Sequence, residues 1–227
     1  MFNAYIQAGI EAERWGRATA GLGEVWETMA VAVKPLPACH FTHACSDAAL
    51  TLVKQHKFAL PDIERIKALV PEEVVKTVCE PVANKRRPAN AYDAQFSIPY
   101  LVAASLVRGR FTLAELEPDA LSDERILRLC DLVDYEIDPR STFPRHYTGE
   151  VQISLKDGRS LVQREAHNRG CADRPLSNAD IVDKFTGNAH MSLSARQAGE
   201  VRDAVLGLEE ATDIRPLIDR ICQAAPR

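Results

Sequence analysis

Residues 34–47 read KPLPACHFTHACSD, and they mark the point where an extended segment gives way to a helix. Pro35 and Pro37 fix their own φ angles and push the residues before them out of the helical region, so this segment cannot be helical. Thr42 is a suitable N-cap, and the apolar residues that follow it predict a helix over about 43–56. The stretch therefore predicts a strand or extended run that leads directly into a helix start.

The same stretch concentrates side chains that can do chemistry. Lys34, His40 and His43 lie within ten residues of one another. Backbone N–H groups at a helix start attract anions, and a lysine beside them can bind a carboxylate or, when desolvated, exchange protons. The alternative is structural, because His43 and Asp47 have the i, i+4 spacing of a simple surface pair. The residues alone leave both interpretations open.

A zinc site is a third interpretation of this stretch. Cys39, His40, His43 and Cys45 are all possible ligands. Their spacing matches none of the usual zinc patterns, and two adjacent residues do not easily turn toward one ion. Cys45 is equally well explained as a small buried residue. We therefore expect no metal.

Working outward, strand and helix signals alternate and then become purely helical. Predicted strands cover about 29–33, 63–70, 74–79 and 132–137, with a hairpin of 149–155 and 159–165 around Asp157-Gly158. Predicted helices cover about 1–27, 43–56, 97–108, 119–131, 178–187, 194–207 and 211–223, and 80–95 is expected to be a loop. This order predicts an α+β fold in three parts, which are residues 1–27, 28–170 and 171–227.

Composition limits the function classes. The chain has 227 residues, a net charge of −4, 46% hydrophobic and 26% charged residues, which suits a globular domain and not a disordered chain. Nothing in this charge balance indicates nucleic-acid binding. No apolar run approaches the roughly 20 residues of a membrane span, and the N-terminus lacks a signal-peptide pattern. The six scattered cysteines favour a reducing, cytoplasmic location.

Two further stretches hold candidate residues. Ser97-Ile-Pro-Tyr100 opens a predicted helix, where a phenol could donate a hydrogen bond or a proton. The alternative, favoured by the residues alone, is that Tyr100 is a core residue with a satisfied hydroxyl. Arg86, within Lys85-Arg86-Arg87, could grip a polyanionic substrate, although a short charged run in a loop is more often only solvated.

Taken together, these residues resemble a known family. Lys34 to His43 followed by Asp47-Ala-Ala-Leu50 resembles the motif that opens the C-terminal domain of the MmgE/PrpD family. Three further stretches agree in order and spacing. They are Ala94 to Tyr100 with Gly109 beyond, Pro144 to Gly158, and Arg169-Gly170 through Pro175-Leu176-Ser177 to Lys184-Phe185. The matches run from about residue 28 to about residue 186.

The resemblance implies a fold and a chemistry. Members join an all-helical domain to a smaller α+β lid domain, usually as homodimers, and act without a cofactor on small di- or tricarboxylates by elimination, decarboxylation or epimerisation. Lys34 matches the family's active-site lysine and Tyr100 its tyrosine, while His40 or His43 lies near the substrate. Cys39, Thr42, Ser97 and Arg86 are expected to bind substrate, and Cys39 stands where some members have histidine.

The resemblance also shows a departure from the family. Only about 27 residues precede the lid domain here, whereas members carry most of the helical domain before it. The chain is therefore expected to be an α+β lid flanked by helices of an incomplete helical domain. We expect it to be inactive alone, and to pair as a homodimer or with a complementary helical chain. A noncatalytic binding or regulatory subunit that docks on a helical partner is the alternative.

Overall fold

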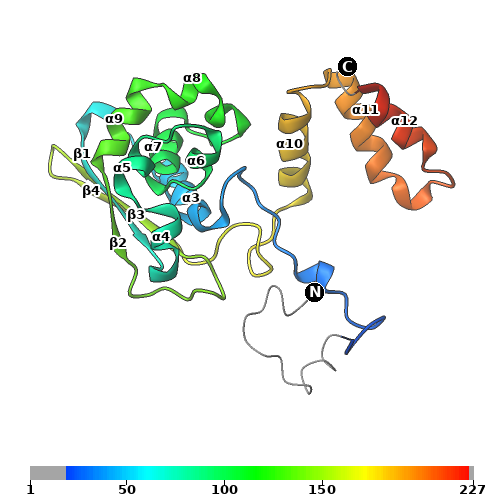
Figure 1. The fold of residues 1–227 in the computed structure, drawn as a ribbon, viewed down its shortest axis with the longest axis horizontal. Helices are drawn as coiled ribbons and strands as arrows, with labels where there is room; N and C mark the ends of the chain where they lie inside the picture. Colours follow the sequence, from blue (N-terminus) through cyan, green and yellow to red (C-terminus); the bar gives the residue numbers. More distant parts are fainter. Residues whose placement is uncertain (1–18, 225–227) are drawn as a thin grey trace.

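A four-stranded mixed sheet forms the centre of the fold (Figure 1). This computed structural model describes residues 19–224. The strand order is β2 (Val133–Ile137), β1 (Ile63–Val70), β3 (Gly149–Leu155) and β4 (Ser160–Glu165). β1 runs parallel to β2 and antiparallel to β3, and β3 and β4 form the hairpin that the sequence predicts. The chain therefore has the predicted α+β class.

One face of the sheet is buried and the other is polar. On β1, Ile66 and Ala68 are fully buried, whereas Arg65 and Lys67 point to the opposite face. There they pair with neighbouring β2, Arg65 with Asp134 at 3.3 Å and Lys67 with Glu136 at 2.6 Å. This alternation is the period of two that places successive side chains on opposite faces of a strand.

Three helices build the core against the sheet. α3 (His40–Gln55) packs on β3 and β4, α9 (Glu124–Leu132) packs on β1 and β2, and α7 (Ile98–Arg108) packs on α3 and α9. α3 lies very close to β3 at Gly149. A Cβ at this position would lie only 2.9 Å from the Cys45 sulfur. This contact fixes where the first turn of α3 stands over the sheet.

The α7 helix has the caps that its sequence predicts. The Ser97 hydroxyl accepts from the Tyr100 amide at 3.0 Å, and Pro99 stands in the first turn. Gly109 ends the helix with φ of 65°, the left-handed conformation that glycine adopts at little cost. Nine residues of the helix are buried, so the prediction of a buried helix over 97–108 is confirmed.

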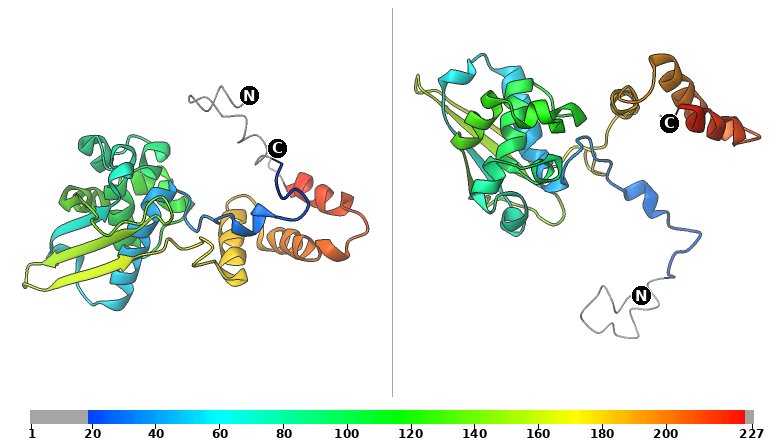
Figure 2. Two further views of the ribbon diagram at one scale, coloured as in Figure 1. Left: turned by 90° about the horizontal axis from the view of Figure 1, so that it is seen from below. Right: turned by 45° about the horizontal axis from the view of Figure 1, so that its top comes forward.

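Three helices follow the sheet and extend away from it. They are α10 (Asn178–Ala189), α11 (Ala195–Leu206) and α12 (Arg215–Ala224) (Figures 1 and 2). Ser177 and Asp180 form the predicted capping box at the start of α10. Between residues 171 and 222, only Ala198 and Val201 are buried. These helices therefore expose most of their apolar side chains.

Several predicted boundaries are wrong. Residues 74–79 are helical and not a strand: Glu72–Val74 is a 3-10 turn and α4 spans Val75–Val78. Two acidic residues in the first turn favour a helix start, and helical spacing buries both Val74 and Val78. Within the predicted loop 80–95, α5 (Val82–Arg86) and α6 (Ala91–Gln95) form short helices.

Two helix starts also differ from the prediction. α3 begins at His40 with Cys39 as its N-cap, so Thr42 lies inside the helix, where its hydroxyl donates to the Cys39 carbonyl at 2.7 Å. The predicted helix 119–131 is divided into α8 (Pro118–Leu121) and α9, because Asp123 starts a new helix by accepting from the Arg125 amide.

The N-terminal predictions are only partly tested. Residues 1–18 of the predicted helix 1–27 lie outside the described residues. Residues 19–24 form turns and Glu27–Ala30 is a 3-10 helix, so neither a helix to residue 27 nor a strand over 29–33 is present there. The boundaries at 27/28 and 170/171 stay predictions. Across residues 19–224, no helix is both long enough and apolar enough to cross a membrane.

Candidate active site

Lys34 is placed by a backbone contact between two distant segments. The Val33 N–H donates to the Gly170 carbonyl at 2.9 Å. Gly170 has φ of 90°, and a Cβ at this position would lie 1.9 Å from the Val33 oxygen. Only glycine permits this approach. The contact holds the segment that carries Lys34 beside the turn at residues 168–171.

The Ala38 carbonyl joins Lys34 to the first turn of α3. It accepts from the Lys34 ammonium group at 3.3 Å and from His43 Nε2 at 3.2 Å. The N-cap Cys39 is held by its own N–H, which donates to the Gln95 carbonyl at 2.9 Å. The lysine and the histidine are therefore fixed relative to the start of α3, where the helix dipole favours an anion.

The two histidines have different environments. His43 is fully buried, and its Nδ1 has no hydrogen-bond partner within residues 19–224. Burial, with a smaller effect of neighbouring His40, lowers the His43 pKa to about 3, so this ring is neutral. His40 is half-buried, and its ring centroid lies 4.8 Å from that of His43. Burial and then Lys34 lower the His40 pKa from its ordinary value.

A hollow of about 340 Å³ opens beside these residues. It is lined by Lys34 and Cys39, by Gln95 at the end of α6, and by Lys184 of α10. Among the described residues, neither lysine has an ion-pair partner. Burial raises the Cys39 pKa, against smaller opposing effects of the Phe41 amide and Lys34, so the thiol stays protonated. The hollow therefore offers positive charge and hydrogen-bond donors to an anion.

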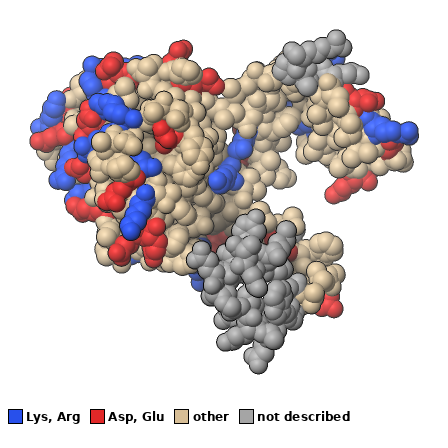
Figure 3. All heavy atoms as spheres, in the orientation of Figure 1, with Lys and Arg blue, Asp and Glu red and all other residues tan. Residues whose placement is uncertain are grey.

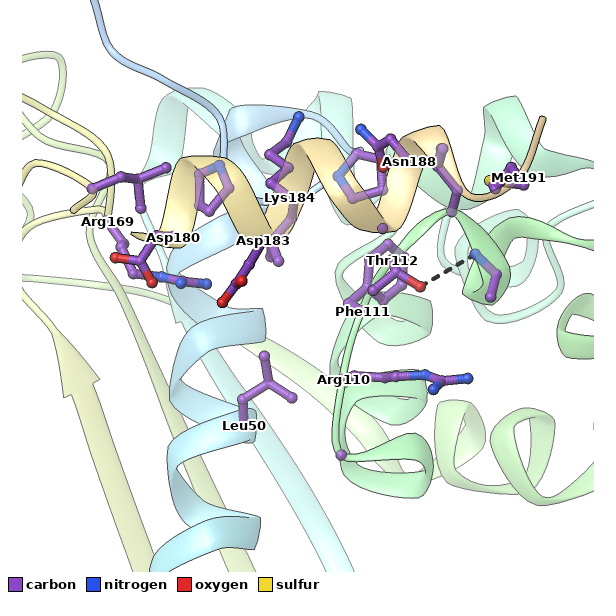
Figure 4. Close-up of a pocket in the computed structure, with 18 of the residues that line it drawn as sticks. Leu50, Arg110, Phe111, Thr112, Arg169, Asp180, Asp183, Lys184, Asn188 and Met191 are labelled. Carbon is purple, nitrogen blue, oxygen red and sulfur yellow. Dashed lines mark hydrogen bonds between the residues drawn. The ribbon is translucent and has the colours of Figure 1, made fainter. Parts of the chain in front are cut away.

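A second hollow, of about 580 Å³, lies on the other side of α10 (Figure 4). It separates α10 from Leu50 of α3 and from the loop that carries Phe111. Asp180 and Asp183 point into it, with Asp180 beside Arg169, whereas Lys184 projects from the opposite side of the helix. Arg169 is itself engaged by buried Asp47, with an N–O distance of 2.9 Å.

Three of the predicted site residues make their contacts elsewhere. The Tyr100 hydroxyl is buried and donates to the Glu115 carbonyl at 2.7 Å, as expected of a core tyrosine. Ser97 caps α7 and donates to the Lys85 carbonyl. Arg86 donates to Asp134 at 2.8 Å and to the neighbouring β2 carbonyl. The structure thus brings together Lys34, Cys39, His40 and His43, with Thr42 in the same turn. It engages Tyr100, Ser97 and Arg86 in structural contacts.

Removing the Tyr100 hydroxyl is expected to affect stability. Tyr100→Phe leaves the buried Glu115 carbonyl without its donor, which should lower the unfolding free energy by about 1–3 kcal/mol. Tyr92→Phe is the matched control, because Tyr92 is 69% exposed and should change stability little. Chemical denaturation measures both variants. Equal stability of Tyr100→Phe and the wild type would contradict the anchoring role.

Acid is expected to destabilise the protein through His43. The folded pKa, about 3, lies below the roughly 6.5 of an unfolded histidine, so the unfolded state binds more protons between these values. Above pH 6.5, His43 should not reduce the unfolding free energy. As the pH drops from 6.5 toward 3, the unfolding free energy should fall by up to about 1.4 kcal/mol per pH unit. His43→Gln should have a shallower slope between pH 6.5 and 5 in denaturation experiments. An unchanged slope would exclude His43 as the source.

Sequence reasoning missed three residues that shape this site. Lys184 lines the same hollow as Lys34, but it lies 150 positions away on α10. Asn168 contacts His40 and Gly170 positions Val33, and both lie in a turn that is far from Lys34 in the sequence. A turn before a helical region gives no sequence signal that it returns to the start of α3.

The fold and the site define an α+β domain that gathers cationic and imidazole groups at the start of its first helix. The model for the MmgE/PrpD C-terminal domain matches residues 36–210, and the chain belongs to the MmgE/PrpD family.

Similarity to curated proteins agrees with this membership. The chain is 29% identical over 190 residues to cis-aconitate decarboxylase of Homo sapiens, covering 81% of this chain and 38% of the relative. It is 25% identical to cis-aconitate decarboxylase-like protein oryM of Aspergillus oryzae (88% of this chain, 42% of the relative). It is also 25% identical to 2-methylcitrate dehydratase of Escherichia coli K12 (75% and 37%). The chain thus spans about two fifths of these relatives.

Proposed function

We propose that this domain forms one wall of an active site for small di- or tricarboxylates, in a lyase or isomerase related to 2-methylcitrate dehydratase and cis-aconitate decarboxylase. The observation that carries the proposal is the pair Lys34 and Lys184. Both line one hollow, and no described carboxylate neutralises either of them. A multiply charged carboxylate substrate is the complement of such a hollow.

The family's reactions begin or end next to a carboxylate. Removing a proton α to a carboxylate creates an aci-carboxylate, whose additional negative charge needs fixed positive partners. Lys34 supplies one, and its contact with the Ala38 carbonyl orients it. His40 assists from the first turn of α3. The role of Tyr100 as proton donor stays a prediction from the resemblance, since its hydroxyl is engaged by Glu115.

The proton acceptor is proposed to come from another chain or domain. The titratable groups that line the hollow are Lys34, Lys184, the protonated Cys39 thiol and Tyr92, so no carboxylate of the described residues lines it. The nearby carboxylate of Asp47 already forms an ion pair with Arg169. We therefore propose that the chain is inactive, or nearly so, without a helical partner.

Exposed apolar side chains support a partner. Trp26 of the N-terminal segment is 70% exposed, Leu206 at the end of α11 is 67% exposed, and Ile214 just before α12 is 54% exposed. Figure 3 shows charges of both signs over the sheet-bearing part and again toward α11 and α12, whereas the visible surface between the sheet-bearing part and α10 is largely uncharged. Such a surface suits a second copy or a complementary helical chain. A cytoplasmic location is part of the proposal, supported by six unpaired cysteines.

The test combines an absorbance assay with calorimetric binding of cis-aconitate. The assay follows the alkene, which forms when 2-methylcitrate is dehydrated and is already present in cis-aconitate. The chain alone should bind cis-aconitate without turnover, and Lys34→Ala should weaken binding while Lys57→Ala should not, because exposed Lys57 lies outside the hollow. Turnover by the chain alone would contradict the missing acceptor. Unchanged binding in Lys34→Ala would contradict the carboxylate site itself.

The second candidate is a noncatalytic binding or regulatory subunit. The exposed apolar faces of α11 and α12 favour it, since docking needs such faces and catalysis does not. Co-purification from the source organism distinguishes the enzyme from the noncatalytic subunit. A helical partner that forms an active complex supports the enzyme, one that forms an inactive complex supports the subunit, and a stable monomer weakens both partner proposals.

A further inference from the structure

We infer that Asn168 is a positioning residue that holds His40 as a neutral imidazole with its proton on Nδ1, so that His40 donates a hydrogen bond and does not accept a proton. The tautomer follows from the contacts of Asn168 alone. Its meaning for carboxylate binding rests on the proposed function.

The orientation of the Asn168 amide is set by the backbone. Its side chain is 3% exposed, and its Oδ1 accepts from the Tyr147 N–H at 3.0 Å. A backbone N–H can only donate, so the oxygen of the amide must face Tyr147. The Nδ2 group, which can only donate, then faces the opposite direction. It lies 2.9 Å from His40 Nε2.

This donor determines the state of the His40 ring. Nε2 must carry a lone pair to accept from Asn168, and a neutral imidazole then has its one proton on Nδ1. A doubly protonated ring would bring two donors together at 2.9 Å and would lose the hydrogen bond. The contact therefore opposes both the other tautomer and the imidazolium.

The groups around His40 also disfavour its imidazolium form. The titratable groups that face it are Lys34 before the helix, His43 one turn along, and Tyr147, whose ring meets that of His40 edge-on at 4.9 Å. Arg169 follows Asn168 and adds positive charge near His43. None of these groups is an anion that could stabilise an imidazolium.

The consequence is a division of roles at the site. His40 Nδ1–H donates to a carboxylate oxygen of the substrate, next to the Lys34 charge, and no proton is transferred to His40. The general base needs a free lone pair, and the only one on this ring, at Nε2, is occupied by the Asn168 amide, so His40 is not placed to act as the base. The base must come from outside this group of residues. Asn168 acts through His40 and touches no reacting atom.

Nitrogen-15 NMR of the full chain tests the tautomer directly, because two-bond couplings from the ring protons distinguish protonated from unprotonated ring nitrogens. The His40 signals are assigned by their loss in His40→Gln. We expect the Nδ1–H tautomer at pH 7, with the His40 pKa below its ordinary value. The Nε2–H tautomer or an imidazolium at pH 7 in the wild type would overturn the inference.

Asn168→Asp provides the second arm. The new carboxylate can still accept from the Tyr147 N–H, but it would accept from His40 Nε2 as well. We expect the His40 titration to shift upward by about 1 pH unit or more and Nε2 to become protonated. Asn178→Asp is the control, because it adds the same charge at an exposed position on α10. An unchanged His40 titration in Asn168→Asp would also overturn the inference.

Added cis-aconitate separates this inference from the proposed function. We expect it to shift the His40 Nδ1 signal in the wild type, with a smaller shift in Asn168→Asp. If the tautomer is Nδ1–H but cis-aconitate shifts no signal at all, the positioning role of Asn168 stands and the carboxylate site fails.

Discussion

If the chain forms the proposed enzyme with a helical partner, replacing Lys34 with alanine is expected to lower its turnover by about 100-fold or more. A single donor aimed at charge that develops in the transition state is commonly worth 10²–10³ in rate. Lys34 has the required placement, because it lines the hollow, stands before the N-terminus of α3 and is held by the Ala38 carbonyl. The measurement is kcat and KM from the alkene absorbance of the proposed complex with a helical partner.

Two variants make this result specific. Lys34→Arg keeps the charge but changes its geometry, so partial activity is expected. Lys57→Ala removes an exposed lysine outside the hollow and should leave kcat unchanged. A Lys34→Ala enzyme with wild-type kcat and KM would remove Lys34 from the mechanism.

Replacing Gly170 with alanine is expected to destabilise the fold and to displace Lys34. The left-handed conformation at φ of 90° costs an alanine roughly 1–2 kcal/mol. In addition, the new Cβ would lie 1.9 Å from the Val33 oxygen, so the 2.9 Å hydrogen bond between these two segments must break. We expect a total loss of about 2–4 kcal/mol in unfolding free energy, together with weaker cis-aconitate binding.

Gly158 provides a matched control. It has φ of 87° in the hairpin turn, and an added Cβ meets nothing within 4 Å. Gly158→Ala should therefore show the conformational cost alone and leave cis-aconitate binding unchanged. Chemical denaturation and calorimetry of the two variants separate the backbone cost from the contact. Equal losses of stability with unchanged binding in both variants would contradict the role of the contact between Gly170 and Val33.

Local sequence signals predicted the elements whose causes are local. The alternating run of β1, the Asp157-Gly158 hairpin, the caps of α7 and the capping box of α10 all have short-range determinants, and the structure confirms them. The errors fell where tertiary packing outweighs propensity. The valines in residues 74–79 favour a strand by propensity, but a helical turn buries the Val74 and Val78 side chains equally well.

Part of the candidate site was also visible in the sequence. Lys34, Cys39, His40 and His43 lie in one stretch, and the proline spacing with the following helix indicates that they meet at a helix start. The resemblance to the MmgE/PrpD family rests on this same stretch and agrees with the family match over residues 36–210. Chemistry carried by neighbours in the chain is therefore readable without a structure.

By itself, the sequence determined the family, the α+β class and the concentration of lysine and histidine before α3, because each depends on residues that are close along the chain. The tertiary structure decided which imidazole is buried, which amide faces His40 and which lysine lines the same hollow as Lys34. The physical reason is distance along the chain. Asn168 and Lys184 are near the site only because the folded chain returns to the start of α3 after β4.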